Sequence, residues 1–260
     1  MSEIKKIAVI GMGHIGKAVI NGLLRGGVKR SNLFLSNESD KNVHAVKKSD
    51  IIFICVKPAV VKEVIYGIRP FLTDDKIIIS VAACVSLKLL ERYFNSKKLK
   101  IMRIMPNIPV AYGKGVVGFI DSPYLSGKER TAVLKILGNL GLTIVCKNEA
   151  MLDKLSLISG CGTGYAGYFM RNLEKVAENY GFSSDDRKRI ILAAFEGAIR
   201  HIMETKISFE GLVEKVATKG GITEEVINNL DKRNYFQNLK AGIDAGYAKI
   251  KKISNNLEGE

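Results

Sequence analysis

The stretch Ile7-Ala-Val-Ile-Gly-Met-Gly-His-Ile-Gly16 joins a short apolar run to three glycines in the pattern G-x-G-x-x-G. The apolar run is typical of a buried strand, and apolar positions then recur at helical spacing from residue 15 to residue 23. Gly11 would allow a tight turn, Gly13 would let a pyrophosphate approach the helix terminus, and Gly16 would let the helix pack closely on the strand. A merely structural glycine turn is the alternative, but the flanking strand and helix favour a dinucleotide site.

Apolar runs and helical periodicity alternate through the first part of the chain. Continuous apolar runs suit parallel strands that are buried on both faces. The alternation predicts an α/β fold, a Rossmann-like doubly wound parallel sheet that binds a dinucleotide, over residues 1–148. The expected strands are Ile7–Ile10, Leu33–Leu35, Ile51–Val56, Ile77–Val81, Lys100–Ile104, Gly115–Ile120 and Leu142–Cys146, with helices at Val60–Phe71, Leu87–Asn95 and Lys128–Leu140.

Beyond residue 148 the strand-like runs disappear and long helical periodicity takes over. We therefore expect a second, all-helical domain over residues 149–260. Only the tail from Asn255 to Glu260 looks disordered. The expected helices are Met151–Ile158, Thr163–Asn179, Ser184–Lys206 with Ser183 or Ser184 as its cap, Phe209–Val216, Thr223–Asp231 and Phe236–Ile253.

The composition is that of an ordinary soluble globular protein, since 47% of the 260 residues are apolar and 25% are charged. The four cysteines form no C-x-x-C pair, so the sequence indicates neither a metal site nor a redox motif, and we expect a reducing, cytoplasmic location. We recognise no leader peptide and no apolar segment long enough to cross a bilayer, so we expect no membrane partner.

The formal charge of +14 raises the alternative of nucleic-acid binding, because clustered lysines and arginines neutralise phosphates. The basic residues are spread along the chain without interleaved aromatic residues, which favours a solvated basic surface. Such a surface would attract an anionic cofactor and substrate, and we expect no nucleic-acid partner. The basic clusters are Lys5-Lys6, Lys47-Lys48, Lys97-Lys98, Arg187-Lys188-Arg189 and Lys251-Lys252.

The end of the second expected strand bears on which nicotinamide cofactor is bound. A carboxylate there would accept hydrogen bonds from the adenosine 2′-hydroxyl and repel a 2′-phosphate. The chain has Ser36-Asn37 at this point, with Lys41 close by, which favours NADPH. Glu38 and Asp40 could swing to the ribose instead, so NADH stays open as the alternative.

Further segments combine unusual residues without serving an obvious helix or strand. Val56-Lys57-Pro58 ends the third strand, at the edge of an α/β sheet where ligands bind. Arg103-Ile-Met-Pro-Asn-Ile-Pro109 follows another strand. Two glycine-rich breaks, Gly160–Tyr165 and Thr218–Thr223, each open a helix. Alone, each break could be a helix-packing surface or a helix–helix loop.

In this order and spacing, the motifs resemble those of the pyrroline-5-carboxylate reductase family, and the resemblance covers the chain from Ile7 to about Ile253. That family has G-x-G-x-M-G, an asparagine several residues before S/A-D, an apolar strand ending V-K-P, and then R-x-M-P-N-x-P, G-S-G-P-A-Y and S-P-G-G-T-T. The middle motifs are specific, whereas the first is generic. The matching residues are Gly11, Gly13 and Gly16; Asn42 before Ser49-Asp50; Val56, Lys57 and Pro58; Arg103, Met105, Pro106, Asn107 and Pro109; Gly160, Gly162 and Tyr165; and Gly220, Gly221 and Thr223.

The resemblance implies that a hydride passes from C4 of the reduced nicotinamide to the imine carbon of Δ1-pyrroline-5-carboxylate, giving L-proline. Because the cofactor carries the hydride chemistry, the protein mainly orients the two partners. By the same resemblance Thr223 would be the catalytic residue, hydrogen-bonded to the ring nitrogen, and backbone N–H groups around Gly220 and Gly221 would hold the substrate carboxylate. The substrate site would also include Thr218 and the loop Met105-Pro106-Asn107.

The cofactor site that the resemblance implies lies in the first domain. Asn42 would meet the adenosine, and the Lys57-Pro58 and Met105-Pro106-Asn107 loops would line the nicotinamide end. His14 is expected to be a surface residue beside the phosphates rather than a catalyst. The full expected set is Gly11, Gly13, His14, Ile15, Gly16, Ser36, Asn37, Asn42, Val56, Lys57 and Pro58, with no metal ligand.

The resemblance also implies self-association. In the family the helical halves of two subunits exchange contacts, so residues 149–260 would serve for dimerisation and substrate binding. The Thr223 loop would then complete a neighbour's active site. A dimer or a larger assembly is implied, and a decamer built from dimers is one form it could take.

The chain departs from the family's pattern at several places. Residues 36–50 have room for little more than one helix, which would leave the adenosine side more open. Cys161, Thr163 and Gly164 replace serine, proline and alanine. Lys219 replaces a proline, so the loop gains flexibility and charge.

Two other functions therefore stay open. One is an NADPH-dependent reductase of another cyclic imine, with Lys219 adding positive charge for a more acidic substrate. The other is a nucleotide-binding paralogue without turnover. The presence of Thr223 and the double glycine argues against the second.

Overall fold

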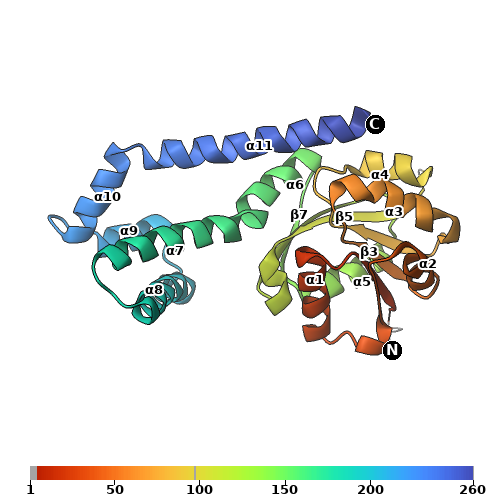
Figure 1. Cartoon of the computed structure of the whole chain (residues 1–260), viewed down its shortest axis with the longest axis horizontal. Helices are drawn as coiled ribbons and strands as arrows, with labels where there is room; N and C mark the ends of the chain where they lie inside the picture. Colours follow the sequence, from red (N-terminus) through yellow and green to blue (C-terminus); the bar gives the residue numbers. More distant parts are fainter. Residues whose placement is uncertain (1–4, 97, 260) are drawn as a thin grey trace. The chain divides into compact units, whose positions relative to one another are not determined.

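A sheet of seven strands forms the centre of the first part of the molecule, in the order β2-β1-β3-β4-β5-β6-β7 (Figure 1). The computed structural model describes residues 5–96 and 98–259, so Lys97 of the Lys97-Lys98 pair and Glu260 of the expected tail lie outside the described residues. The seven expected strands are confirmed, and their ends shift by at most two residues. The strands are β1 Ile7–Ile10, β2 Leu33–Ser36, β3 Ile51–Ile54, β4 Ile77–Ser80, β5 Lys100–Pro106, β6 Gly115–Asp121 and β7 Gly141–Val145.

Helices cover both faces of this sheet, as a doubly wound arrangement requires. Strand side chains point alternately to the two faces, so Ile7 and Val9 join one core while Ala8 and Ile10 join the other. Helices α1 (His14–Arg25) and α5 (Gly127–Gly138) pack on the first face, and α2 (Ser39–Lys47), α3 (Val61–Ile68) and α4 (Leu87–Phe94) pack on the second.

Strand β6 departs from the expected all-parallel sheet, because it runs antiparallel to β5, with Met105 opposite Gly118. The other neighbouring pairs are parallel. A parallel connection needs roughly a dozen residues or more. Residues 107–114 hold only a short 3-10 helix, η4 Ile108–Tyr112, so the chain turns back on itself.

The link between β2 and β3 holds only α2, as its short length predicts. Strand β2 therefore lies at the edge beside β1, and the strand order reverses between β1 and β3. In open α/β sheets such a reversal forms a ligand-binding crevice at the carboxyl ends of the strands. The glycine turn that follows β1 lies at this crevice.

Up to Gly259, the last described residue, only helices follow β7, as expected, and Ser183 caps α8 through its side-chain oxygen, which accepts from the Asp186 N–H. Between α6 and α7 the chain forms a π-helix. The elements are α6 Glu149–Leu155, the π-helix Ser156–Gly160, α7 Gly162–Asn179, α8 Ser184–Thr205, α9 Phe209–Val216, α10 Ile222–Lys232 and α11 Tyr235–Gly259.

Two compact units make up the chain. The sheet unit contains Met1–Thr163 and Gly246–Glu260, and the helical unit contains Gly164–Ala245. The chain therefore returns to the sheet unit at its end, and the expected disorder of the tail is wrong. Helix α11 continues to Gly259, and Leu257 is buried in the core cluster that also contains α4 residues. The Arg92 guanidinium donates hydrogen bonds to the Leu257 and Glu258 carbonyl oxygens, at 3.3 and 3.0 Å.

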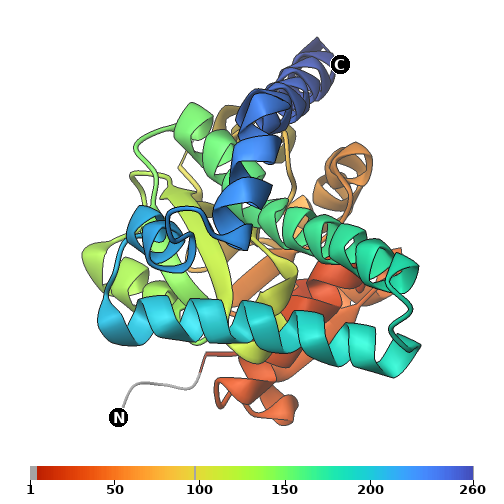
Figure 2. The same ribbon diagram turned by 90° about the vertical axis from the view of Figure 1, so that its left-hand side faces the viewer.

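The helical unit has little core of its own. Ile191 is the one buried hydrophobic residue among its described positions, whereas Tyr168, Met203 and Ile222 are 62%, 73% and 87% exposed. The described elements of this unit are all helices, drawn from teal to blue in Figure 2. So much exposed apolar surface marks an interaction surface. None of the helices within residues 5–96 and 98–259 is apolar over a stretch long enough to cross a membrane.

Candidate nucleotide and substrate site

The glycine turn has the geometry that its sequence predicts. Gly11 has a φ of +96°, and a Cβ there would come within 2.6 Å of the Cys55 carbonyl oxygen, so only glycine fits. The Gly11 N–H donates to the Ser36 carbonyl at 2.8 Å, which ties the turn to the end of β2. A Cβ on Gly16 would collide with the Gly11 carbonyl, whereas the space around Gly13 is open. A ligand can therefore approach the backbone at Gly13.

The amino-terminal end of α1 is suited to an anion. Gly13 is the N-cap and provides no side-chain hydrogen bond, and the first turn of α1 contains no acidic residue. The first N–H groups, from His14, Ile15 and Gly16, thus face the turn without a carboxylate beside them in that helix. Helix N-termini of this kind bind phosphates through their N–H groups and the helix dipole.

The predicted adenosine end lies where β2 meets α2. The Asn37 side-chain oxygen accepts from the Met12 N–H at 3.2 Å, and the Ser36 hydroxyl donates to the Glu38 carbonyl at 3.1 Å. Lys41 and Glu38 form an exposed ion pair at 3.0 Å. Because such surface pairs contribute little, about 0–1 kcal/mol, Lys41 can exchange this carboxylate for a phosphate.

Asn42 carries an unsatisfied acceptor at the same end of the sheet unit. Its side chain is 6% exposed, and Oδ1 is buried without a hydrogen-bond partner among the described residues. Leaving a buried acceptor unpaired costs about 1–3 kcal/mol. A ligand hydroxyl or amine would satisfy it, so Asn42 fits the adenosine role that the resemblance implies.

The end of β3 forms the floor of the glycine turn. The Cys55 N–H donates to the Ile10 carbonyl at 2.7 Å, and burial raises the pKa of the Cys55 thiol to about 12. The thiol is therefore neutral and serves packing rather than nucleophilic chemistry. Next along the chain, Lys57 is exposed and is the N-cap of a 3-10 helix that begins with Pro58. Val56 lies beside the turn, because a Cβ on Gly11 would come within 2.8 Å of its Cγ1, whereas contact of Lys57-Pro58 with the cofactor stays a prediction.

The expected substrate loop at the end of β5 is held by the protein itself. Both ends of the Asn107 amide bind backbone groups: Oδ1 accepts from the Val116 N–H at 2.8 Å, and Nδ2 donates to the Ser159 carbonyl at 3.1 Å. Met105 is buried, and Pro106 ends the strand. Asn107 therefore connects this loop to β6 and to the π-helix, while contact with a substrate stays a prediction.

The second expected substrate loop, Thr218–Thr223, belongs to the helical unit. Gly220 has a φ of +75°, and Gly221 is the N-cap of α10, with its N–H bound to the Thr218 carbonyl at 2.8 Å. The Gly220 N–H donates to a carboxylate oxygen of Glu224 at 2.6 Å. The loop thus already holds a carboxylate at the backbone where the resemblance implies the substrate's carboxylate.

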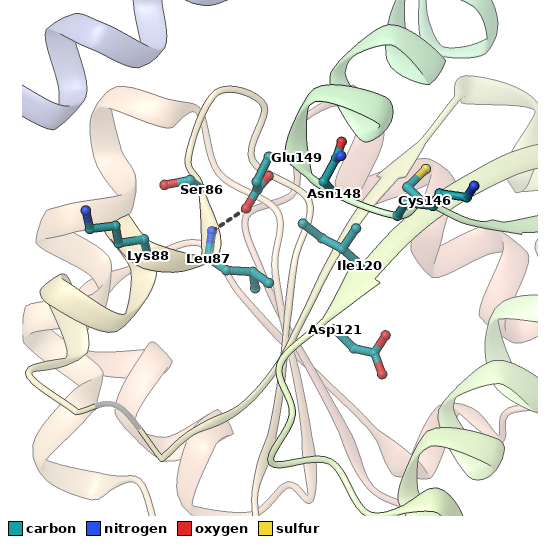
Figure 3. A pocket seen from close by; sticks show the side chains of 9 residues that line it. Ser86, Leu87, Lys88, Ile120, Asp121, Cys146, Asn148 and Glu149 are labelled. Carbon is teal, nitrogen blue, oxygen red and sulfur yellow. Dashed lines mark hydrogen bonds between the residues drawn. The ribbon is translucent and has the colours of Figure 1, made fainter.

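A pocket of about 390 Å³ in the sheet unit is lined by other residues (Figure 3). Its wall includes Ser86-Leu87-Lys88 at the start of α4 and Cys146–Glu149 before and at the start of α6. Neither the glycine turn nor Met105-Pro106-Asn107 lines it, so it is not the predicted nucleotide site.

An ion cluster around the buried Arg103 adjoins this pocket, and Arg103 is its one member that belongs to a motif of the sequence. Arg103 is 1% exposed and forms ion pairs with Glu149 and Asp153 of α6. The signal in the sequence is the acidic pair at i and i+4 on one helix face. Nothing in the sequence places that face against β5.

Comparisons with known proteins agree with this architecture. A family model described as pyrroline-5-carboxylate reductase dimerisation matches residues 149–253, and one described as NADP oxidoreductase coenzyme F420-dependent matches residues 6–84. Among solved structures, a Plasmodium falciparum pyrroline carboxylate reductase with NADP bound has a TM-score of 0.89 at 24% identity, covering 96% of this chain and 98% of that one. The fold and the glycine turn define a Rossmann-type oxidoreductase with a helical dimerisation region.

Sequence relatives are more specific. Pyrroline-5-carboxylate reductase of Aquifex aeolicus is 30% identical over 79% of this chain and 76% of its own length. Pyrroline-5-carboxylate reductase 2 of Bacillus subtilis is 29% identical over 98% of this chain and 97% of its own. The chain belongs to the pyrroline-5-carboxylate reductase family, which confirms the resemblance stated from the motifs.

Proposed function

We propose that this protein reduces Δ1-pyrroline-5-carboxylate to L-proline with NADPH, the last step of proline biosynthesis. The observation that carries the proposal is the match over nearly the whole chain to relatives named for this activity. The glycine turn and the Thr218–Thr223 loop supply the two binding functions that such a reaction needs.

The chain's own residues bind and orient the reactants. When bound, reduced nicotinamide supplies the hydride that adds to the imine carbon, while a proton ends on the ring nitrogen of proline. The end of α1 holds the pyrophosphate, and backbone N–H groups at Gly220 and Gly221 hold the substrate carboxylate. The Thr223 hydroxyl hydrogen-bonds the ring nitrogen and fixes the face that receives the hydride.

NADPH is the proposed cofactor, with NADH as the alternative. The open backbone at Gly13 and the unsatisfied Asn42 Oδ1 support a nucleotide in this crevice. Lys41, paired with the exposed Glu38, supports binding of the 2′-phosphate. The ratio of the two Michaelis constants tests this preference.

Self-association through the helical unit is the second part of the proposal. The dimerisation model matches residues 149–253, and the exposed apolar side chains of α7–α10 need a cover. A second copy of the chain provides it, in a cytoplasmic dimer or in a decamer built from dimers. Sedimentation of the purified protein distinguishes these assemblies.

Steady-state oxidation of NADPH with Δ1-pyrroline-5-carboxylate tests the activity. We expect saturable turnover with formation of proline. Turnover with another cyclic imine but not with Δ1-pyrroline-5-carboxylate would show that the substrate is a different imine. The exposed Lys219 beside Gly220 would then favour a more acidic substrate. Tight NADPH binding without any turnover would identify a nucleotide-binding paralogue and refute the proposal.

A further inference from the structure

Helix α6 and the π-helix run along one face of β5 and meet it at three successive positions. Arg103 and Met105 lie on the same face, because side chains alternate along a strand, and Asn107 follows directly after the strand ends at Pro106. Arg103 pairs with Glu149 and Asp153, at 3.2 Å to the latter. Two residues on, Met105 packs in a cluster with Leu152 and Leu155. Two further on, Asn107 Nδ2 donates to the π-helix at the Ser159 carbonyl.

The contact between α6 and the sheet is close. Gly118 lies opposite Met105 on β6, and a Cβ at Gly118 would overlap the Leu155 side chain and come within 3.0 Å of Leu152. The absence of that Cβ lets the helix lie directly on the strands. A small shift of α6 would therefore disturb the packing around Met105.

Arg103 is the charged anchor of this arrangement. Its side chain is 1% exposed, and the buried guanidinium donates through Nη1 and Nη2 to two carboxylates from consecutive turns of one helix, while its Nε is buried without a hydrogen-bond partner among the described residues. Glu149 also accepts the Leu87 N–H at 2.7 Å, which joins the start of α4 to the same cluster (Figure 3). Three elements are thus fixed by one set of charges.

The π-helix that follows α6 leads into the glycine-rich segment Gly160–Tyr165, which matches one of the family's motifs. The π-helix ends at Gly160 and is followed by Cys161-Gly162-Thr163. Its first turn is closed by the Cys161 N–H, which donates to the Ser156 carbonyl at 2.9 Å. Single-turn π-helices occur frequently at functional sites. Here the widened turn presents the Ser159 carbonyl to Asn107.

We propose that Arg103 is a positioning residue: through Glu149 and Asp153 it fixes α6 along β5 and so holds the Met105-Pro106-Asn107 loop in place for hydride transfer. This inference rests on the proposed function. The network shares no hydrogen bond with the glycine turn among the described residues, so the pyrophosphate site at the end of α1 is independent of it.

The test compares two charge-neutralising variants whose basic partners, Arg103 and Lys100, lie on the same strand, β5. Asp153→Asn removes one partner of Arg103, whereas the control Glu129→Gln removes the partner of Lys100, a part-buried pair at 2.7 Å at the other end of β5. For Asp153→Asn we expect kcat/KM for Δ1-pyrroline-5-carboxylate to fall about ten- to hundredfold, as displacement of a reacting group does, with a much smaller loss of NADPH affinity because the pyrophosphate site is intact. Glu129→Gln should lower the unfolding temperature and leave kcat/KM unchanged.

Hydrogen exchange supplies a readout that needs no turnover. Asp153→Asn should speed exchange in residues 105–116 and 156–161, and Glu129→Gln should not. If Asp153→Asn does not fold, Glu149→Gln takes its place, since Glu149 is 35% exposed. Normal kcat/KM with normal exchange, or equal losses in the control, would overturn the positioning role. A wild-type protein that reduces no pyrroline-5-carboxylate refutes the proposed function instead, and exchange alone then decides whether the network holds the loop.

Discussion

Replacing Leu257 by alanine is expected to lower the free energy of unfolding of the sheet unit by about 2 kcal/mol, near the lower end of the range for such core deletions. Leu257 is 8% exposed, and full burial of a leucine contributes about 1.5–3 kcal/mol. Leu257 lies two residues before the end of α11, so this helix end can shift and partly close the cavity, which places the cost low in the range. Urea unfolding at one fixed protein concentration measures the change, because self-association shifts apparent stability.

Asn256→Ala is the matched control. Asn256 is exposed on the same helical turn, and alanine is the better helix former, so its stability should stay the same or rise slightly. A loss below about 0.5 kcal/mol in Leu257→Ala, the size of an ordinary surface effect, would refute the docking of the carboxyl-terminal turn on α4. Equal losses in both variants would indicate helix fraying instead.

Three other predictions concern the loop and the sheet. Thr223→Ala should reduce turnover about a hundredfold with nearly unchanged NADPH binding, and an unaffected rate would remove Thr223 from the site. Glu224→Ala frees the Gly220 N–H, so KM for the substrate should fall up to about tenfold, and an unchanged KM would show that this N–H does not bind substrate. Burial raises the pKa of Glu129, but hydrogen bonds, led by that from Lys100, lower it to about 2 overall. The stability it provides is therefore present above about pH 4.5 and lost as the pH falls towards 2, and Glu129→Gln should flatten that part of an acid-unfolding curve.

Features that depend on local sterics could be predicted from the sequence. Glycine is required at positions 11 and 16 because backbone carbonyl groups lie too close there for a Cβ atom. The strands follow from continuous apolar runs. The single helix between β2 and β3 follows from the length of that link. The antiparallel direction of β6 could also have been predicted, because the link of residues 107–114 is too short for a parallel connection. The alternation of strands and helices predicts a parallel pair instead, and that prediction is wrong.

Contacts between distant parts of the chain were decided only by the tertiary structure. The acidic pair Glu149 and Asp153 looks like a solvated helix face in the sequence, and its partner Arg103 lies 46 and 50 residues away. Arg92 meets Leu257 across 165 residues, so a polar tail that looked disordered becomes an ordered helix end. Sequence periodicity tells which face of a helix is apolar, but it does not tell which strand that face will meet. The glycine turn and the reaction family were therefore readable from the sequence, whereas the packing that positions the Met105-Pro106-Asn107 loop required the folded chain, because it depends on side chains that only the fold brings together.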